Sequence, residues 1–383
     1  MRIAMVTDSY YPTRDGVVTS ITIAKEGLEQ LGHEVVVVAP DPGKEQRMDG
    51  VYYFPAAKFK NYPGYFVPIF PSNKIEVLRS IGPDMIHIHG MAPMALKALI
   101  AARHLKLPTV LTFHTMVGDT IKFYSPLKLF PEGQKKLIWA YLRFMLRRPD
   151  AIIGPTASTI NELLEHRVRP RRIEVIPTGI DISRFSPGGD GTAIRKRFGL
   201  QNEKVALYVG RLSFEKNIDV VINALRYVDG VKLLIAGKGP AKESLEETAK
   251  EAGVSDRVIF AGFVSDDEIT QLYAAADLSV SASKFETQGL SVLEALACGL
   301  PAACANERAF KDVIKDGENG FLFDGGAEEC ADAMRKCIEH GDAVTVNARA
   351  TAESLSVASC AKKLEELYTE LIAERKQKRR FRR

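Results

Sequence analysis

Two glutamates flank a glycine turn in the segment KFETQGLSVLEALACGLP. Glu286 lies in the turn, and Glu294 lies eight residues later, inside an apolar helix that is expected to begin near Leu290. A carboxylate among apolar residues needs partners, because its burial without them is costly. The paired hydroxyls of a ribose would supply two donors, and an internal salt bridge is the alternative. The backbone N–H groups of Gln288, Gly289 and Leu290 open the same helix and could hold a phosphate or a sugar hydroxyl.

Two cations follow an apolar run at residues 205–209. They are Arg211 and Lys216 in the string GRLSFEKN, which leads into a helical pattern. A diphosphate needs this combination of a forked donor and a point charge at the entrance of a helix. Solvated surface cations are the alternative interpretation of the pair.

A glycine loop and three histidines stand out in the first half of the chain. Gly16 follows the apolar run at residues 3–7 and opens a helix, so its loop offers backbone N–H groups to an anion. His87 and His89 alternate near the end of an expected strand, and His89 is the stronger candidate for a ligand contact. His114 follows the next apolar run.

Apolar strands that alternate with helices must position these residues. In the first half we expect strands at 3–7, 34–39, 85–89, 109–113, 151–154 and 172–176. In the second half we expect them at 205–209, 232–236, 257–261, 278–281 and 301–305. Continuous apolar strands between helices indicate parallel sheets that are covered on both faces. The chain is therefore expected to form two doubly wound α/β domains in tandem.

The Gly- and Pro-rich string SPGGDG at residues 186–191 marks the expected domain boundary. We expect an N-terminal domain at residues 1–186 and a C-terminal domain at 187–356, with a C-terminal helix at about 357–383 that packs back towards the first domain. Ligands of doubly wound sheets bind at the carboxyl ends of the strands. A cleft between the two domains is therefore the expected active site.

Composition narrows the class of protein. The chain has 383 residues, of which 46% are hydrophobic and 26% charged, as in a soluble globular protein. No stretch is long and apolar enough to span a membrane, and Asp8 follows the first apolar run too soon for a signal peptide. The five cysteines form no CxxC pair, which favours reduced residues in a cytoplasmic protein.

The strings ETQGLSVLEALACGLP, GRLSFEKN and AGKGP resemble the donor-binding half of retaining GT-B glycosyltransferases, specifically glycosyltransferase family 4. In the first half, the strings DMIHIHG, TFHT and IPTGID agree with the same family. The resemblance spans nearly the whole chain. It implies a GT-B fold, in which two Rossmann-like domains face a cleft, and a hexosyl transfer from a nucleotide sugar. In place of the family's common double glycine, this chain has Asp15 and Gly16.

The resemblance also implies a role for each motif residue. Glu286 would contact the transferred sugar, Glu294 the ribose, and Arg211 and Lys216 the diphosphate. His114 would lie at the sugar. The remaining donor contacts would come from Gly16, Phe263, Val264, Gln288, Gly289 and Leu290.

The same resemblance implies that cationic side chains and helix ends, rather than a metal ion, neutralise the departing nucleoside diphosphate. No cofactor is expected, and a UDP-sugar is favoured over a GDP-sugar as donor. The anomeric configuration would be retained by a front-face route, with Glu286 disfavoured as a covalent nucleophile.

The acceptor is expected to bind the first domain. Residues 120–148 combine seven Lys and Arg residues, one glutamate and many apolar residues, including Trp139, the single tryptophan. A basic amphipathic segment of this kind is typical of an anionic membrane surface, and a core helix with a solvated basic face is the alternative. The wording of the ETQGL string also resembles family members that glycosylate diacylglycerol. We therefore expect a lipid or lipid-linked acceptor at the inner membrane face, with acceptor contacts from His89, Asp119, Lys122 and Tyr124.

Other functions remain open at this stage. They include transfer to a soluble sugar or sugar phosphate, UDP-sugar 2-epimerisation and a non-catalytic nucleotide-binding subunit. A dehydrogenase is disfavoured, because neither expected first turn contains G-x-G-x-x-G. The basic tail RKQKRRFRR has no nucleic-acid recognition motif beside it, and the oligomeric state is not indicated.

Overall fold

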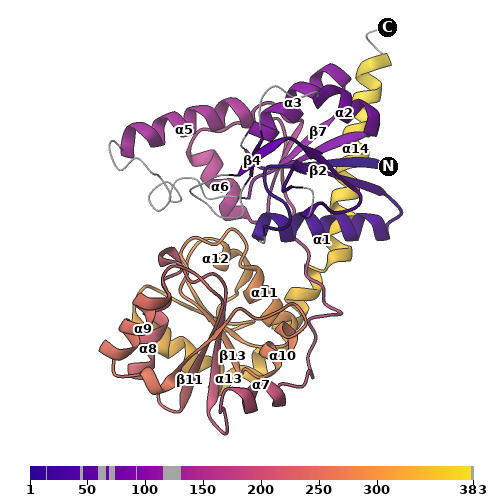
Figure 1. Cartoon of the computed structure of the whole chain (residues 1–383). Coiled ribbons are helices and arrows are strands. Elements are labelled where there is room, and N and C mark those ends of the chain that lie inside the picture. The colour runs from indigo at the N-terminus through magenta and orange to yellow at the C-terminus, as the bar shows by residue number, and fades with distance from the viewer. Residues whose placement is uncertain are drawn as a thin grey trace. The chain divides into compact units, whose positions relative to one another are not determined.

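The chain divides into two compact units, each built on a parallel sheet (Figure 1). The computed structural model describes residues 1–13, 15–43, 46–58, 66–68, 74–91, 93–114 and 131–380. The first unit comprises Met1–Gly179 and Val357–Arg383, and the second comprises Ile180–Ser356. The first unit ends a few residues before the boundary expected at 186, because Ile180 and Phe185 are buried in a core of the second unit.

The strands of the first sheet run parallel in the order β3-β2-β1-β6-β7-β8-β9. They are β1 (Arg2–Thr7), β2 (Glu34–Pro40), β3 (Val51–Phe54), β6 (Met85–His89), β7 (Thr109–Thr112), β8 (Ala151–Gly154) and β9 (Ile173–Val175). Two short strands, β4 (Ala56–Lys58) and β5 (Phe66–Pro68), form a separate antiparallel pair.

Both faces of this sheet are buried, because successive residues of each apolar strand point to opposite faces. Ile3 and Met5 of β1 pack into one core with helices α1 (Gly16–Gln30) and α14 (Val357–Arg380). Ala4 and Val6 pack into the other core. The helices on that side are α2 (Lys74–Ile81), α3 (Pro93–Leu105), α5 (Pro131–Leu146) and α6 (Ala157–Glu165).

The C-terminal helix α14 crosses α1 and packs against it, although the two helices come from opposite ends of the chain (Figure 1). They are in close contact at Gly27, where a Cβ atom would lie 2.8 Å from Cβ of Ala361. Any larger residue at this position would force the two helices apart. The last helix is therefore an integral part of the first unit.

The second sheet is also parallel, in the order β12-β11-β10-β13-β14-β15. Its strands are β10 (Lys204–Val209), β11 (Val231–Ala236), β12 (Val258–Gly262), β13 (Leu278–Ser281), β14 (Ala302–Ala305) and β15 (Phe321–Phe323). The α-helices are α7 (Thr192–Arg197), α8 (Ile218–Ala224), α9 (Lys242–Glu251), α10 (Ile269–Ala274), α11 (Leu290–Ala297), α12 (Ala309–Val313) and α13 (Ala327–Ser354). Three short 3₁₀ turns complete the unit, η2 (Phe214–Lys216), η3 (Leu225–Tyr227) and η4 (Ser255–Arg257).

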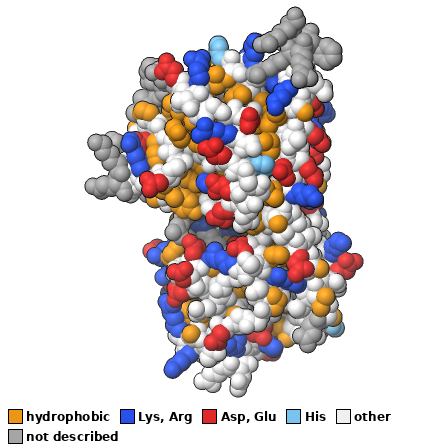
Figure 2. Space-filling model, turned by 90° about the vertical axis from the view of Figure 1, so that its right-hand side faces the viewer, with side chains coloured by type: hydrophobic (Ala, Val, Ile, Leu, Met, Phe, Trp, Pro, Cys, Tyr) orange, Lys and Arg blue, Asp and Glu red, His pale blue; other side chains and the backbone are white. Residues whose placement is uncertain are grey.

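Each sheet has one point at which the strand order reverses direction. In the first sheet this switch point lies between β1 and β6, and in the second it lies between β10 and β13. The loops that leave the carboxyl ends of these neighbouring strands run to opposite faces, and the space between them is where doubly wound sheets bind ligands. On the outer surface, acidic and basic side chains are interspersed over most of the face shown in Figure 2.

Candidate active site

An ion pair joins the two loops at the switch point of the second unit. Lys216 Nζ lies 2.6 Å from Glu286 Oε1, and both side chains are about one-fifth exposed. Lys216 ends the turn that follows β10, and Glu286 lies in the loop that follows β13. The structure therefore brings together a cation and a carboxylate that are seventy residues apart in the sequence.

The backbone beside Lys216 is tied to the same place. Asn217 adopts a left-handed conformation, with φ of 48°, and its Nδ2 donates a hydrogen bond to the carbonyl of Ala282 at 3.2 Å. Asparagine is one of the few residues that tolerate this conformation. The bond fastens the loop after β10 to the end of β13, so the Lys216 side chain is held near Glu286 in the ligand-free protein.

Arg211 lies in the same loop but has a different partner. Its Nη2 is 3.5 Å from Oε1 of Glu215, which also accepts a hydrogen bond from Ser213 Oγ at 2.6 Å. The Tyr208 hydroxyl donates to the carbonyl of Arg211 at 3.1 Å. Glu215 and Ser213, which were not predicted as site residues, lie within the GRLSFEKN string and orient its arginine.

Close backbone packing explains the glycines of the AGKGP string. Gly237 has a φ of 150°, and a Cβ atom there would lie 1.8 Å from the carbonyl oxygen of Gly210. At Gly239 a Cβ would lie 2.1 Å from the carbonyl oxygen of Leu212. Only glycine permits the loops after β10 and β11 to lie this close, so these residues support the loop that carries Arg211.

Glu294 lies in α11 and is hydrogen-bonded to a buried tyrosine rather than to a cation. The Tyr273 hydroxyl donates to Glu294 Oε2 at 2.7 Å. Burial raises the pKa of Glu294 to about 7, although the Tyr273 hydrogen bond and the charge of Arg184 oppose this rise. At neutral pH the carboxyl group is therefore close to half-protonated. Further hydrogen-bond donors would stabilise its charged form and lower its pKa.

Helix α11 begins at a glycine, which has no side chain to cap it. Gly289 precedes the helix with φ of 74° and makes no side-chain cap hydrogen bond. A Cβ at Gly289 would also lie 2.6 Å from the ring of Phe310, so both conformation and space demand glycine there. Gln288 beside it is buried. Uncapped N–H groups at a helix start can bind phosphate or hydroxyl oxygens.

Phe263 and Val264 follow β12, at the same carboxyl edge of the second sheet. Phe263 is 57% exposed, and Lys238 Nζ lies 5.7 Å from the centre of its ring. Val264 packs against the adjoining core. An exposed aromatic ring at the sheet edge is available to stack against a planar ligand.

In the first unit, the helix start at Gly16 is partly occupied. Asp15 caps α1, and its Oδ1 accepts hydrogen bonds from the N–H groups of Val17 and Val18, both at 2.9 Å. The Asp15 carboxylate thus takes two of the donors that a phosphate would use. Gly16 itself has open space where a side chain would be.

Three histidines cluster at the carboxyl ends of β6 and β7. His89 Nδ1 lies 3.0 Å from His114 Nε2, and the His87 and His89 rings are 3.9 Å apart. His89, for which an acceptor contact was predicted, is only 2% exposed and supports His114 from the interior. Burial lowers the pKa of His114 to about 4 and holds the pKa of His89 well below its usual value. All three rings are therefore neutral near pH 7.

His87 is also tied to the C-terminal helix, which sequence reasoning did not foresee. Its Nδ1 shares a hydrogen bond of 2.6 Å with the Tyr368 hydroxyl, and its Nε2 shares one of 2.7 Å with Thr112 Oγ1. Burial lowers the pKa of His87 to about 3. The contact with Tyr368 makes α14 part of the support for the histidine cluster.

The expected acceptor residues Asp119, Lys122 and Tyr124 lie outside the described residues. Of the basic segment at 120–148, the described part is α5 and the turn that follows it. Trp139 is 3% exposed and its ring centre lies 3.7 Å from that of His166, so this residue belongs to the core and not to a surface element. Among the side chains of α5 that the structure describes, the large exposed apolar ones are instead Leu137, Tyr141 and Phe144.

Two parallel-sheet units with polar loops at their switch points are the architecture of the GT-B class, and comparisons with known proteins identify the chain as a glycosyltransferase. The family described as "Glycosyltransferase Family 4" matches residues 14–184, and "Glycosyl transferases group 1" matches residues 190–353. The chain is 30% identical to an alpha-monoglucosyldiacylglycerol synthase of Streptococcus pneumoniae, over 97% of this chain and 86% of that protein. The chain therefore belongs to glycosyltransferase family 4.

Two further relatives show the breadth of this likeness. A GDP-mannose-dependent alpha-mannosyltransferase of Mycolicibacterium smegmatis is 29% identical over 86% of each chain. The crystal structure of HepE from Anabaena with UDP matches with a TM-score of 0.78 and 22% identity, over 97% of this chain and 100% of that one. The expected GT-B fold and glycosyltransferase activity are thus confirmed.

Proposed function

We propose that this glycosyltransferase moves a hexose from a nucleoside-diphosphate sugar, in the first place a UDP-sugar, to a hydroxyl of a lipid or lipid-linked acceptor with retention of the anomeric configuration. The Lys216–Glu286 ion pair at the switch point carries the proposal. A cation for phosphate and a carboxylate for hydroxyl groups lie side by side there, as a sugar diphosphate requires.

Donor binding would exchange partners within this pair. The diphosphate takes the Lys216 ammonium, joined by Arg211 from the same loop, and the hydroxyl groups of the hexose donate to Glu286. In this role the Glu286 carboxylate accepts hydrogen bonds from the sugar and forms no covalent bond to it, and retention would follow a front-face route.

The rest of the donor would follow the carboxyl edge of the second sheet. Glu294 accepts hydrogen bonds from the ribose hydroxyls. These hydroxyls supply the donors that the carboxylate loses when burial removes its water. The N–H groups of Gln288, Gly289 and Leu290 receive oxygens at the start of α11. Phe263 and Val264 border the base, and Gly16 contributes from the first unit.

The chemical step would depend on dispersing the charge of the departing nucleoside diphosphate. Lys216, Arg211 and the dipole of α11 supply fixed positive charge where negative charge develops. His114 is hydrogen-bonded to His89 through Nε2, so Nδ1 is the ring nitrogen that remains for a ligand. Because burial keeps this ring neutral, it acts as a hydrogen-bonding group and adds no competing charge.

The lipid acceptor is supported by the relative from Streptococcus pneumoniae, whose name specifies monoglucosyldiacylglycerol. Helix α5 adds a local argument, since exposed Leu137 and Phe144 share the helix with Lys136 and are followed by Arg147 and Arg148. Such a surface suits peripheral binding to an anionic leaflet on the cytoplasmic side. Among the described residues, no helix is long and apolar enough to cross a membrane.

The test is a transfer assay with UDP-glucose, UDP-galactose and GDP-mannose as donors and either diacylglycerol vesicles or soluble sugars as acceptors, in the presence of EDTA. We expect an α-linked glycolipid from a UDP-sugar, with activity unchanged by EDTA because the charge on the leaving group is met by Lys216 and Arg211. Efficient transfer to soluble sugars alone would refute the lipid acceptor, and an epimerised nucleotide sugar would refute transfer as the main activity.

A further inference from the structure

A basic groove lies on the first unit at the edge of the sheet remote from His114. It has a volume of about 1130 Å³ and reaches Thr109, the first residue of β7, whereas His114 follows the last residue of that strand. At about 3.3 Å per residue, the four residues of β7 alone separate the two edges by about 13 Å. The groove therefore is no part of the histidine cluster.

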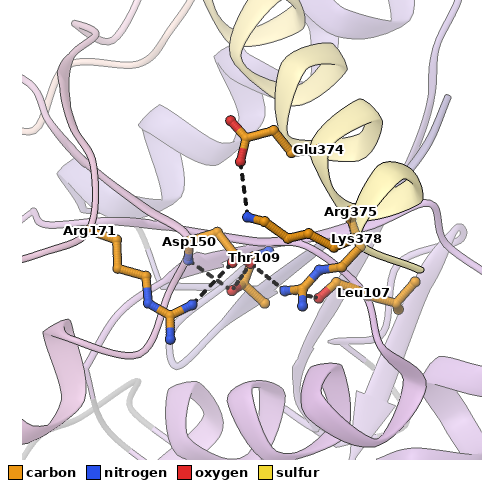
Figure 3. A network of polar contacts seen from close by, with 7 residues as sticks. All are labelled: Leu107, Thr109, Asp150, Arg171, Glu374, Arg375 and Lys378. Atoms are coloured by element: carbon orange, nitrogen blue, oxygen red, sulfur yellow. Dashed lines mark hydrogen bonds and ion pairs between the residues drawn. The ribbon is translucent and has the colours of Figure 1, made fainter. Parts of the chain in front are cut away.

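Four segments that are far apart in the sequence form this groove. They are α3 with the turn that follows it into β7, the turn from α5 into β8, the loop before β9, and the last turns of α14. Asp150 fastens them together, because its Oδ2 accepts hydrogen bonds from Arg375 Nη2 at 2.8 Å and from the N–H of Thr109 at 2.9 Å (Figure 3). Arg375 also donates to the carbonyl of Leu107 at 3.3 Å, and Arg171 Nη1 lies 3.5 Å from Asp150 Oδ1.

The groove concentrates charge of one sign. Eight of its lining residues are Lys or Arg, and none is Asp or Glu. Asp150, the acid at its base, is already shared by Arg375 and Arg171. Three other exposed cations, Arg103, Arg147 and Lys376, make no ion pair with any carboxylate in the described part of the chain. This contrasts with the interspersed charges on the face in Figure 2.

The negative C-terminal ends of nearby helices balance only part of this positive charge. The C-termini of α3 and α5 each supply about half a negative charge, which favours one cation in each last turn. With Asp150 and with Glu374, which lies 3.3 Å from Lys378, included, about three negative charges face eight positive ones. Like charges so close together repel one another and raise the local potential, which attracts anions. Arginine forks also match the oxygens of a phosphate group in pairs.

We propose that this groove is a second anion site, which binds a ligand that carries phosphate groups. Its volume exceeds that of a single phosphate, and apolar side chains including Ile100, which is 46% exposed, lie beside the cations. The same chemistry is offered by a phospholipid headgroup and by a soluble polyphosphate. The inference is independent of the proposed donor. It shares Arg147 and Arg148 with the α5 surface named above, so binding of tripolyphosphate, which involves no membrane, is its primary test.

The test compares two variants with the same change in charge. Arg103→Gln/Arg147→Gln/Lys376→Gln removes the groove cations that have no ion pair, and Arg79→Gln/Lys362→Gln/Lys363→Gln removes three exposed cations elsewhere in the first unit. Calorimetric titration with inorganic tripolyphosphate should show affinity at least tenfold weaker in the groove variant and within twofold of the parent in the control. The titration is repeated in Lys216→Gln, where groove binding should persist although the donor edge has lost a cation.

Flotation with phosphatidylglycerol–phosphatidylcholine vesicles then distinguishes the sources of phosphate. Loss of vesicle binding in the groove variant, but not in the control, supports a lipid headgroup as the ligand. Loss of tripolyphosphate binding with vesicle binding unchanged supports a soluble ligand. If the groove variant and the control variant, both shown by circular dichroism to be folded, behave alike with both probes, the proposal is wrong.

Discussion

Lys216 and Glu286 neutralise each other at 2.6 Å across the switch point of the second sheet, so each is the other's partner until a ligand replaces it. Neighbouring parallel strands β10 and β13 make this possible, because their carboxyl ends place both loops at one edge. Two variants of the pair should therefore affect different parts of the donor.

Lys216→Ala should weaken binding of nucleoside diphosphate and nucleotide sugar alike, by about 10- to 100-fold, because a charge-assisted hydrogen bond to phosphate is lost. Glu286→Gln should leave the affinity for nucleoside diphosphate equal or higher, since Lys216 is released, but should abolish any additional affinity that the sugar confers. Isothermal titration calorimetry with both ligands measures the difference. Equal losses for both ligands in Glu286→Gln would contradict the assignment of this carboxylate to the sugar.

Donor affinity should rise with pH and level off above about pH 7. Burial raises the pKa of Glu294 to about 7 in the free protein, and two hydroxyl donors would lower it in the complex. Binding then favours the deprotonated carboxyl group, so affinity falls by up to about tenfold per pH unit below pH 7. Dissociation constants for UDP between pH 5.5 and 8.5 test this. Glu294→Gln serves as the comparison, because titration of the ligand is common to both proteins and only the wild type should retain the additional slope.

The buried histidines should make the protein sensitive to mild acid. The folded-state pKa of His87, about 3, lies below the value of about 6.5 expected in the unfolded chain, so the unfolded state binds more protons below pH 6.5. The contribution of His87 to the free energy of unfolding is therefore fully present above pH 6.5. It falls with decreasing pH, by about 2 kcal/mol at pH 5. Denaturant unfolding at pH 7 and pH 5 should show a smaller loss in His87→Gln than in the wild type, whatever the absolute stability of the variant.

Membrane binding should depend on the exposed side chains of α5 and not on Trp139. Leu137 and Phe144 are 72% and 52% exposed, whereas Trp139 is buried against His166. Leu137→Ser/Phe144→Ser should reduce co-sedimentation with anionic vesicles several-fold. Val346→Ser is the matched control, because Val346 is 73% exposed on α13 of the second unit. A vesicle-induced shift in the emission of Trp139 would argue that α5 rearranges on the membrane.

The local pattern of residues determined which segments are strands and helices and which loops carry polar groups. Apolar runs such as residues 205–208 are buried on both faces, as is typical of parallel sheets that are covered by helices. The loops after such strands share one edge, so Lys216 and Glu286 could be assigned to the same region from the sequence. The turn that contains Gly289 was also recognisable from the sequence, because a glycine stands directly before the apolar helix there.

Only the tertiary structure decided the partners and the burial of single side chains. Glu294 is bonded to Tyr273 of α10 rather than to a cation, His87 is bonded to Tyr368 of the last helix, and His89 is buried where an acceptor contact was expected. Trp139 likewise turned inward, although its helix has a basic face. Periodicity along a chain shows that a segment has an apolar side. Which residues pack against that side depends on segments that can be hundreds of residues away. Helix α14 is the example here, because it packs against α1 and β6 from the other end of the chain.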